Sequence, residues 1–147
     1  MSIIKIIGIA AGAAIAGLAG LAVLNPGNVA ETSGTPKEEA LRTRRYKTDL
    51  EKFVAEAEKI IPTLTKYGQN WRFISTTADE KTATLKAEIP VVLFTDDLEI
   101  KAENDAGKGE IVVNIRSNSR VGKSDLGENR RHVLQLLAAL DEKFGAK

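Results

Sequence analysis

The sequence predicts an α+β domain: an antiparallel sheet of about four or five strands with two amphipathic helices packed on it, preceded by one N-terminal transmembrane helix. Three observations predict this fold. An uncharged apolar run opens the chain, two later segments carry apolar residues at three- and four-residue steps, and the region between them alternates apolar and polar residues. Consecutive strands joined by short turns indicate an antiparallel sheet, and a sheet with one face covered accommodates both periodicities.

The apolar run at residues 6–24 (IIGIAAGAAIAGLAGLAVL) has no charge and no strong hydrogen-bonding side chain. A helix of these 19 residues spans about 28 Å, close to the ~30 Å hydrocarbon core of a bilayer. The run exceeds the apolar core of an ordinary cleaved signal peptide, which favours an uncleaved membrane anchor over residues 1–24. Lys5 precedes the run and three basic residues follow within about 20 positions, so the positive-inside rule favours a single-pass membrane protein with a cytoplasmic soluble domain.

Small residues recur every four positions within this run: Gly8, Gly12, Ala16 and Gly20. One interpretation is a smooth ridge that lets a partner helix approach closely in the membrane. The other is that alanine and glycine simply dominate the composition here, and the sequence leaves both open. Prolines, glycines and short polar residues predict a linker at residues 25–37, before a soluble domain at residues 38–147.

Composition argues against several kinds of site. Lys and Arg number 21 against 20 Asp and Glu, which leaves no net basic footprint for nucleic acid. The chain has no cysteine, which excludes disulfides, zinc thiolates and thiol nucleophiles. A single histidine excludes a multi-histidine metal site within one chain. No metal and no cofactor is expected, because no nucleotide-binding fingerprint is present either.

The first helix of the soluble domain is expected from about Leu50. Before it, residues 41–46 fit either a first strand or the lead-in to the helix, and Thr48 and Glu51 have capping-box spacing. Pro62 is expected to interrupt the helix, because proline removes a backbone hydrogen bond. The apolar stripe consists of Leu50, Phe53, Val54, Ala57, Ile60, Ile61 and Leu64.

From Trp71 the apolar residues recur with a period of two. This alternation predicts strands separated by turns at Asp79-Glu80, near Pro90 and at residues 104–109. The apolar residues expected to share the covered face are Leu85, Ala87, Ile89, Ile111, Val113 and Ile115.

The last helix is expected to begin after Asp125, which has capping-box spacing to Glu128. Its predicted apolar stripe consists of Leu126, Val133, Leu134, Leu137, Leu140 and Phe144. When the helix is phased on Leu126, Arg130 falls about 40° away and inside the stripe, whereas Arg131 and His132 fall outside it.

Two opposite charges are thus aimed inward. Asp96 shares its strand parity with apolar neighbours such as Leu98, and Arg130 lies in the predicted stripe. An unpaired buried charge costs several kcal/mol, whereas a paired one is tolerated. We therefore predict that Asp96 and Arg130 lie close together, with Arg116, Ser117 or Arg120 as additional partners.

The segment at residues 116–131 (RSNSRVGKSDLGENRR) is unusually rich in charged and small polar residues. The predicted polar cluster consists of Asp96, Arg116, Ser117, Arg120, Ser124, Asp125, Asn129 and Arg130. The favoured interpretation is structural, with the cluster fixing the loop and the last helix onto the sheet. The second is a cradle for phosphate, sulfate or a lipid head group, built from Arg116, Arg120, Lys123 and helix N-terminal amides. No catalytic residue is assigned, because His132 is expected on the outer face without an acid or nucleophile beside it.

These segments resemble the domain-of-unknown-function family 1499. The resemblance covers about residues 42–140, and its most specific parts are residues 94–98 (FTDDL) and 116–131. It implies a small protein of a bacterial or plastid lineage, several of whose relatives carry a membrane segment, and it implies no reaction, ligand or partner. Family versions often have alanine at the position of Asn118 and an aromatic residue near Lys123, so Lys123 is not expected in a shared site.

The sequence therefore favours a membrane-anchored, non-enzymatic α+β domain that binds a partner protein or an anionic ligand near the bilayer, without nucleic acid. Two alternatives stay open. A helix-grip-like carrier of a small hydrophobic ligand needs an apolar cavity of about 300 Å³ or more between sheet and helix. An enzyme with an Asp/Arg polar site needs Asp96, Arg116 and Arg130 around a pocket that is open to solvent.

Overall fold

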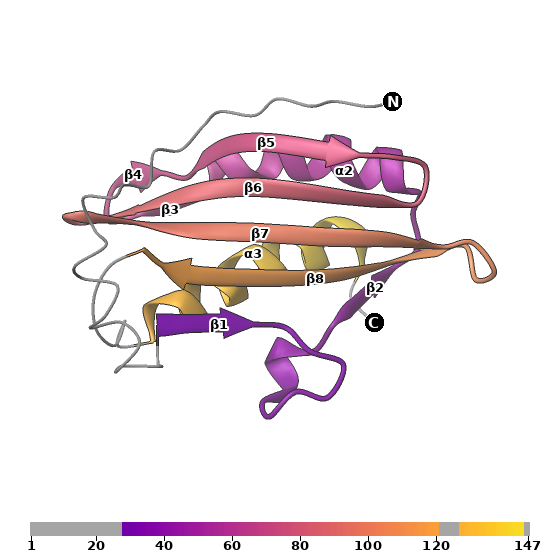
Figure 1. The fold of residues 1–147 in the computed structure, drawn as a ribbon, viewed down its shortest axis with the longest axis horizontal. Helices are drawn as coiled ribbons and strands as arrows, with labels where there is room; N and C mark the ends of the chain where they lie inside the picture. The colour runs from indigo at the N-terminus through magenta and orange to yellow at the C-terminus, as the bar shows by residue number, and fades with distance from the viewer. Residues whose placement is uncertain (1–27, 121–126, 146–147) are drawn as a thin grey trace.

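The computed structural model describes residues 28–120 and 127–145 of the 147-residue chain (Figure 1). In chain order the elements are β1 (Val29–Glu31), the 3-10 turn η3 (Glu39–Leu41), β2 (Arg44–Tyr46), α2 (Leu50–Ile60), the 3-10 turn η4 (Ile61–Thr63), β3 (Thr65–Lys66), β4 (Gln69–Asn70), β5 (Arg72–Ala78), β6 (Thr82–Val91), β7 (Phe94–Asp105), β8 (Glu110–Ser119) and α3 (Glu128–Phe144). The predicted α+β class is confirmed.

The described residues contain no helix that is long and apolar enough to cross a bilayer. The predicted transmembrane segment at residues 6–24, with its ridge of small residues, lies outside the part of the chain that the structure describes.

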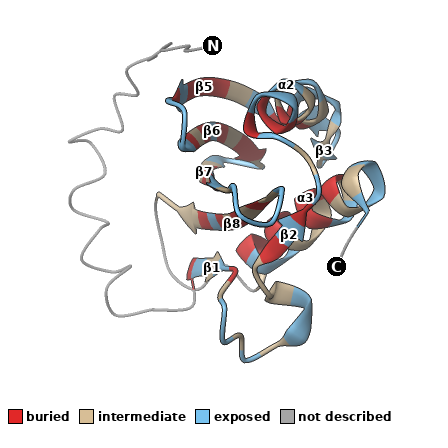
Figure 2. Cartoon of the chain, turned by 90° about the vertical axis from the view of Figure 1, so that its right-hand side faces the viewer, coloured by how far each residue is buried: buried red, intermediate tan, exposed pale blue. Residues whose placement is uncertain are grey.

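The main sheet is antiparallel, as predicted. It has six strands in the order β1-β8-β7-β6-β5, with β2 also paired to β8. Strands β5 to β8 follow one another through short turns, and α2 and α3 pack on the same face of the sheet (Figures 1 and 2). The sheet is larger than the predicted four or five strands because two short N-terminal strands add to its edge.

Strands β1 and β2 share the free edge of β8. Val29–Glu31 pair with Asn118–Arg116, and Arg44–Tyr46 pair further along β8. The side-chain hydroxyls of Thr32 and Thr43 both donate to Asn114 Oδ1, at 2.7 and 2.6 Å, across the break between the two strands. The segment predicted as a linker at residues 25–37 therefore contributes a strand to the sheet.

The core lies between the sheet and the two helices. The apolar residues that the alternation assigned to the covered face of β6 and β8 are all buried, at 2% exposure or less. Tyr46 of β2, Phe53 of α2 and Phe144 of α3 pack ring against ring with centroids 5.3 to 6.3 Å apart. This buried cluster runs continuously from sheet to helices. A carrier needs an apolar cavity in that space, so the helix-grip-like alternative gains no support.

The start of α2 differs from the predicted capping box. Asp49 caps the helix, with its carboxylate accepting from the Lys52 amide at 2.7 Å, while the Thr48 hydroxyl is buried without a hydrogen-bond partner among the described residues. The predicted interruption near Pro62 is confirmed, because α2 ends at Ile60 and η4 carries the proline.

The turn between β6 and β7 also differs from the prediction. It was expected near Pro90, but β6 continues through Pro90, which pairs with Thr95, and the chain turns at Val92-Leu93. The pairing of β5 with β6 ends at Glu88, so no strand lies beside Pro90 on the β5 side. The N–H that proline lacks is therefore not needed for a hydrogen bond on that side.

Helix α3 begins at Glu128, after Gly127 with a φ of 82°. The predicted cap Asp125 lies outside the described residues. The buried face of α3 consists of Glu128, Asn129, His132, Val133, Leu136, Leu137 and Leu140. The predicted stripe was phased on Leu126, a residue that precedes the helix, and this rotated the expected face towards Arg130. The prediction that His132 faces outward is therefore wrong, because His132 is fully buried.

Candidate functional site

A buried polar cluster lies at the end of the sheet where β1 begins, β8 ends and α3 starts. Asn129, on the first turn of α3, is fully buried and joins these three elements. Its side-chain oxygen accepts from the Ser117 hydroxyl at 2.7 Å, and its amide donates to Ser119 Oγ at 2.9 Å and to the Asn28 carbonyl at 2.8 Å. Asn129 thus fixes the position at which the chain enters the sheet.

The partner of Asp96 is His132 and not Arg130. Asp96 Oδ2 lies 3.0 Å from His132 Nε2, and both side chains are buried. The other ring nitrogen, Nδ1, has no hydrogen-bond partner among the described residues and faces the Glu128 carboxylate at 3.8 Å. The indole of Trp71 packs edge-on against the imidazole with centroids 5.9 Å apart. The predicted inward direction of Asp96 is correct, but the predicted Asp96–Arg130 pair is wrong.

Glu128 is the second buried acid of this region. The hydroxyl of Tyr67 donates to its carboxylate at 2.6 Å, the Lys66 ammonium lies 2.9 Å away, and the Arg131 guanidinium lies 3.2 Å away. Burial acts to raise the pKa of Glu128, but these three donors outweigh it and hold the pKa at about 2. The contacts tie the β3–β4 hairpin to the first turn of α3.

The predicted arginines lie apart from Asp96. Arg130 is exposed and pairs with Glu38, its Nε 2.9 Å from the carboxylate. Arg120 bridges Asp97, at 2.9 Å, and Glu88 on the open face of the sheet, and these carboxylates raise the pKa of Arg120.

Of the cations predicted for the anion cradle, Arg120 is therefore already paired with carboxylates. The Asp/Arg enzyme site is not assembled either, because Asp96 is buried beneath the sheet whereas Arg116 and Arg130 are exposed elsewhere. Of the other predicted members, Ser117 and Asn129 do meet, and Ser124 and Asp125 lie outside the described residues.

Sequence reasoning missed four members of this region: His132, Glu128, Lys66 and Tyr67. A signal for the first two was present, since His132 and Glu128 lie four and eight positions before Leu136, on its helix face. Lys66 and Tyr67 belong to a two-residue-per-strand hairpin that carried no comparable signal.

An apolar tip, formed by Val92, Leu93 and Phe94, closes the β6–β7 hairpin at this same end of the sheet (Figure 1). These side chains are 69%, 85% and 52% exposed. Val92 has a φ of 51°, a left-handed conformation that costs a β-branched residue more than glycine or asparagine. Tyr67, 56% exposed, lies in the neighbouring β3–β4 turn.

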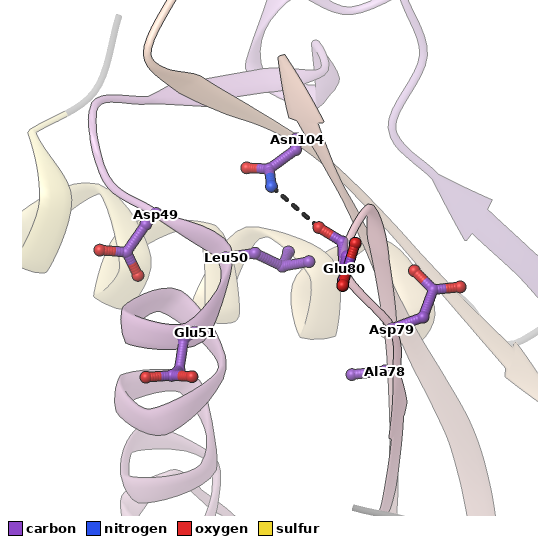
Figure 3. A pocket seen from close by; sticks show the side chains of 7 residues that line it. All are labelled: Asp49, Leu50, Glu51, Ala78, Asp79, Glu80 and Asn104. Atoms are coloured by element: carbon purple, nitrogen blue, oxygen red, sulfur yellow. Dashed lines mark hydrogen bonds between the residues drawn. The ribbon is translucent and has the colours of Figure 1, made fainter. Parts of the chain in front are cut away.

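The opposite end of the sheet is acidic. There a cavity of about 660 Å³ lies between the start of α2 and the β5–β6 turn (Figure 3). Two of the acids that line it already have structural roles, because Asp49 caps α2 and Asp79 accepts from the Lys81 and Thr82 amides at 2.8 Å. Across residues 28–120 and 127–145, no three acidic or histidine side chains form a metal-binding group.

The open face of the sheet carries charges of alternating sign. In one row across four strands, Lys86 stands opposite Glu99, Glu99 opposite Arg116, and Arg116 opposite Glu31. Arg116 is about half exposed, donates to Asn118 at 3.2 Å and lies 4.0 Å from Glu31, at the limit of an ion pair. A shallow cavity of about 270 Å³ lies beside it.

Comparison with known proteins identifies one family. A family model described as "Protein of unknown function (DUF1499)" matches residues 22–140. No curated protein and no solved structure matches the chain.

Proposed function

The chain belongs to the DUF1499 family, whose description gives no activity, and from the geometry we propose that it is a membrane-anchored binding module. Residues 6–24 span the bilayer once, the folded domain is held against the membrane surface on the cytoplasmic side, and the open face of its sheet binds a partner protein. No catalytic step is part of this proposal.

The observation that carries the proposal is how soon the chain becomes fixed after the apolar run. Asn28 is buried and its carbonyl is bonded by Asn129. Four residue steps separate Leu24 from Asn28, which gives a reach of at most about 14 Å. A domain with so short a connection keeps the end of the sheet at which β1 begins close to the bilayer surface.

The partner is expected on the open face because the other face is covered by α2 and α3 (Figure 2). Arg116 lies on β8, next to the edge strand β1, and part of its guanidinium is unused by strong ion pairs. Arginine is over-represented among the residues that dominate interface energies. The alternating charges around Arg116, with Glu31 and Glu99 on either side, favour a partner protein that carries charges of both signs over a free anion.

Anchoring is tested by floating the full chain with phosphatidylcholine vesicles and extracting the vesicles with alkaline carbonate. We expect the full chain to stay with the lipid, because a bilayer-spanning helix resists carbonate extraction. A variant that lacks residues 6–24 is the matched control, and it should remain in the aqueous fraction. Recovery of the full chain in the carbonate supernatant would contradict the anchor.

Partner binding is tested by cross-linking in native membranes followed by mass spectrometry. The variant Arg116→Glu is compared with Lys101→Glu, which reverses an exposed charge one row away on the same face. We expect Arg116→Glu to lower the recovery of a cross-linked partner about tenfold or more, as for a central interface residue. Equal recovery from both variants would remove this face from the proposal.

A further inference from the structure

We propose that the apolar tip is a second membrane contact, which inserts into the interfacial layer of the lipid bilayer. The inference rests on the proposed function, because the anchor at residues 6–24 brings this end of the domain to the membrane. It adds a fixed orientation: the strands of the sheet run away from the bilayer, with the β6–β7 turn in the lipid.

The tip is unusual for a hairpin turn in water. Turns of two residues usually carry glycine, asparagine or aspartate, which are polar or small and adopt a positive φ at little cost. Here Val92 takes the positive φ, and Leu93, at 85%, is the most exposed large apolar side chain in the described part of the chain. A turn that keeps three adjacent apolar side chains in the open, one of them in a strained conformation, fits an apolar environment.

The distances agree with insertion. Val29 is level with Asn118 on β8, and Asn118 with Asp97 on β7. Leu93 lies four residues beyond Asp97, or about 13 Å at ~3.3 Å per residue, which is about 10 Å beyond Asn28. The reach from Leu24 to Asn28 is about 14 Å at full extension. A connection that is about 4 Å shorter than full extension therefore brings Leu93 level with Leu24, at the bilayer interface.

The chemistry of the two sheet ends also differs. Near the tip, the exposed ring of Tyr67 has its hydroxyl bonded to Glu128, and tyrosine is enriched where lipid meets water. At the other end the β7–β8 turn is flanked by Asp105 and Glu110, which both pair with Arg45, and it lies close to the cavity of Figure 3. Inserting that end would desolvate carboxylates, whereas inserting the apolar tip buries hydrocarbon.

The chain has no cysteine, so single-cysteine variants of the full chain report one position each. We would label Leu93→Cys and, as the matched control in the opposite turn, Lys108→Cys with the environment-sensitive dye NBD. Both labelled chains are reconstituted in phosphatidylcholine vesicles that contain lipids with a nitroxide on the acyl chain. Flotation of each sample measures anchoring separately from insertion.

We expect a blue-shifted emission at position 93 and roughly twofold or more stronger quenching by the nitroxide lipid than at position 108, as for side chains buried at the acyl boundary. Aqueous iodide should quench the control and spare position 93. The expected difference persists at high salt, because apolar burial is not screened. If the chain floats but both positions behave as water-exposed, tip insertion is wrong and the anchor stands. If the chain does not float, the proposed function and this inference fail together.

Discussion

Replacing Asn129 with alanine tests whether the polar cluster holds β1, β8 and α3 together. The substitution removes the hydrogen bonds to Ser117, Ser119 and the Asn28 carbonyl, at 2.7, 2.9 and 2.8 Å. Each is worth about 0.5–1.5 kcal/mol net, and a buried group left without a partner costs about 1–3 kcal/mol. Because Ser117 and Asn129 are fully buried, we expect a loss of about 3 kcal/mol in the free energy of unfolding.

The assay is urea unfolding of the full chain in mild detergent, followed by the fluorescence of the single tryptophan, Trp71. Trp71 is buried and packs against His132 in the same region. With a slope of about 1–3 kcal/mol per molar urea, the expected loss lowers the midpoint by roughly 1–3 M.

The control is Asn118→Ala, an asparagine-to-alanine change on the open face of β8. Asn118 is half-buried, its amide makes a long contact of 3.5 Å, and its side-chain oxygen accepts an exposed hydrogen bond from Arg116 at 3.2 Å, so its loss should cost less than about 1 kcal/mol. If Asn129→Ala and Asn118→Ala unfold at the same urea concentration, the cluster does not hold α3 and β1 as argued.

Three further experiments test other contacts. In a double-mutant cycle with alanine, Asp96 and His132 should show a coupling energy of about 1–2 kcal/mol in the free energy of unfolding. The same cycle for Asp96 and Arg130 should give less than about 0.5 kcal/mol. A larger coupling energy for Asp96 with Arg130 than with His132 would restore the pair predicted from the sequence. Glu128 has a pKa of about 2, lowered from 4.5, so it contributes stability that is present above about pH 5 and is lost as the pH falls towards 2. Glu128→Gln should flatten the plot of unfolding midpoint against pH in that range. An unchanged slope would show that the three donors do not lower the pKa of Glu128. Val92→Gly should raise the free energy of unfolding by about 1 kcal/mol by relieving the positive φ, and a lower melting temperature would argue against strain there.

Strand faces were predictable because a period of two does not drift along the chain. The alternation placed Asp96 inward and the aliphatic residues of β6 and β8 on the covered face, and all are buried. The helix face was harder, since its phase depends on which residues are assumed to lie in the helix. Leu126 precedes α3, so it gives no information about which face of the helix is buried. Leu136 and Leu140 lie within the helix, and a buried face phased on them includes His132.

Two other features left weak signals. The turn at Val92-Leu93 has no glycine, asparagine or proline at its centre, so the sequence pattern predicted that Val92 and Leu93 belong to a strand. Strand β1 is short, and its neighbours are the prolines and glycines that usually mark a linker. Its pairing depends on β8, far away in sequence, and local patterns carry no information about such a partner.

The sheet edge that β1 and β2 share along β8 also sets the order in which the domain folds during synthesis. Strands β5 to β8 are joined by short turns and close over short loops as they leave the ribosome. Strand β1 is made first but pairs with residues 116–118, and Asn28 meets Asn129 across 101 positions. Strand β1 is therefore the last strand of the sheet to find its partner, and it becomes fixed once α3 and Asn129 are in place.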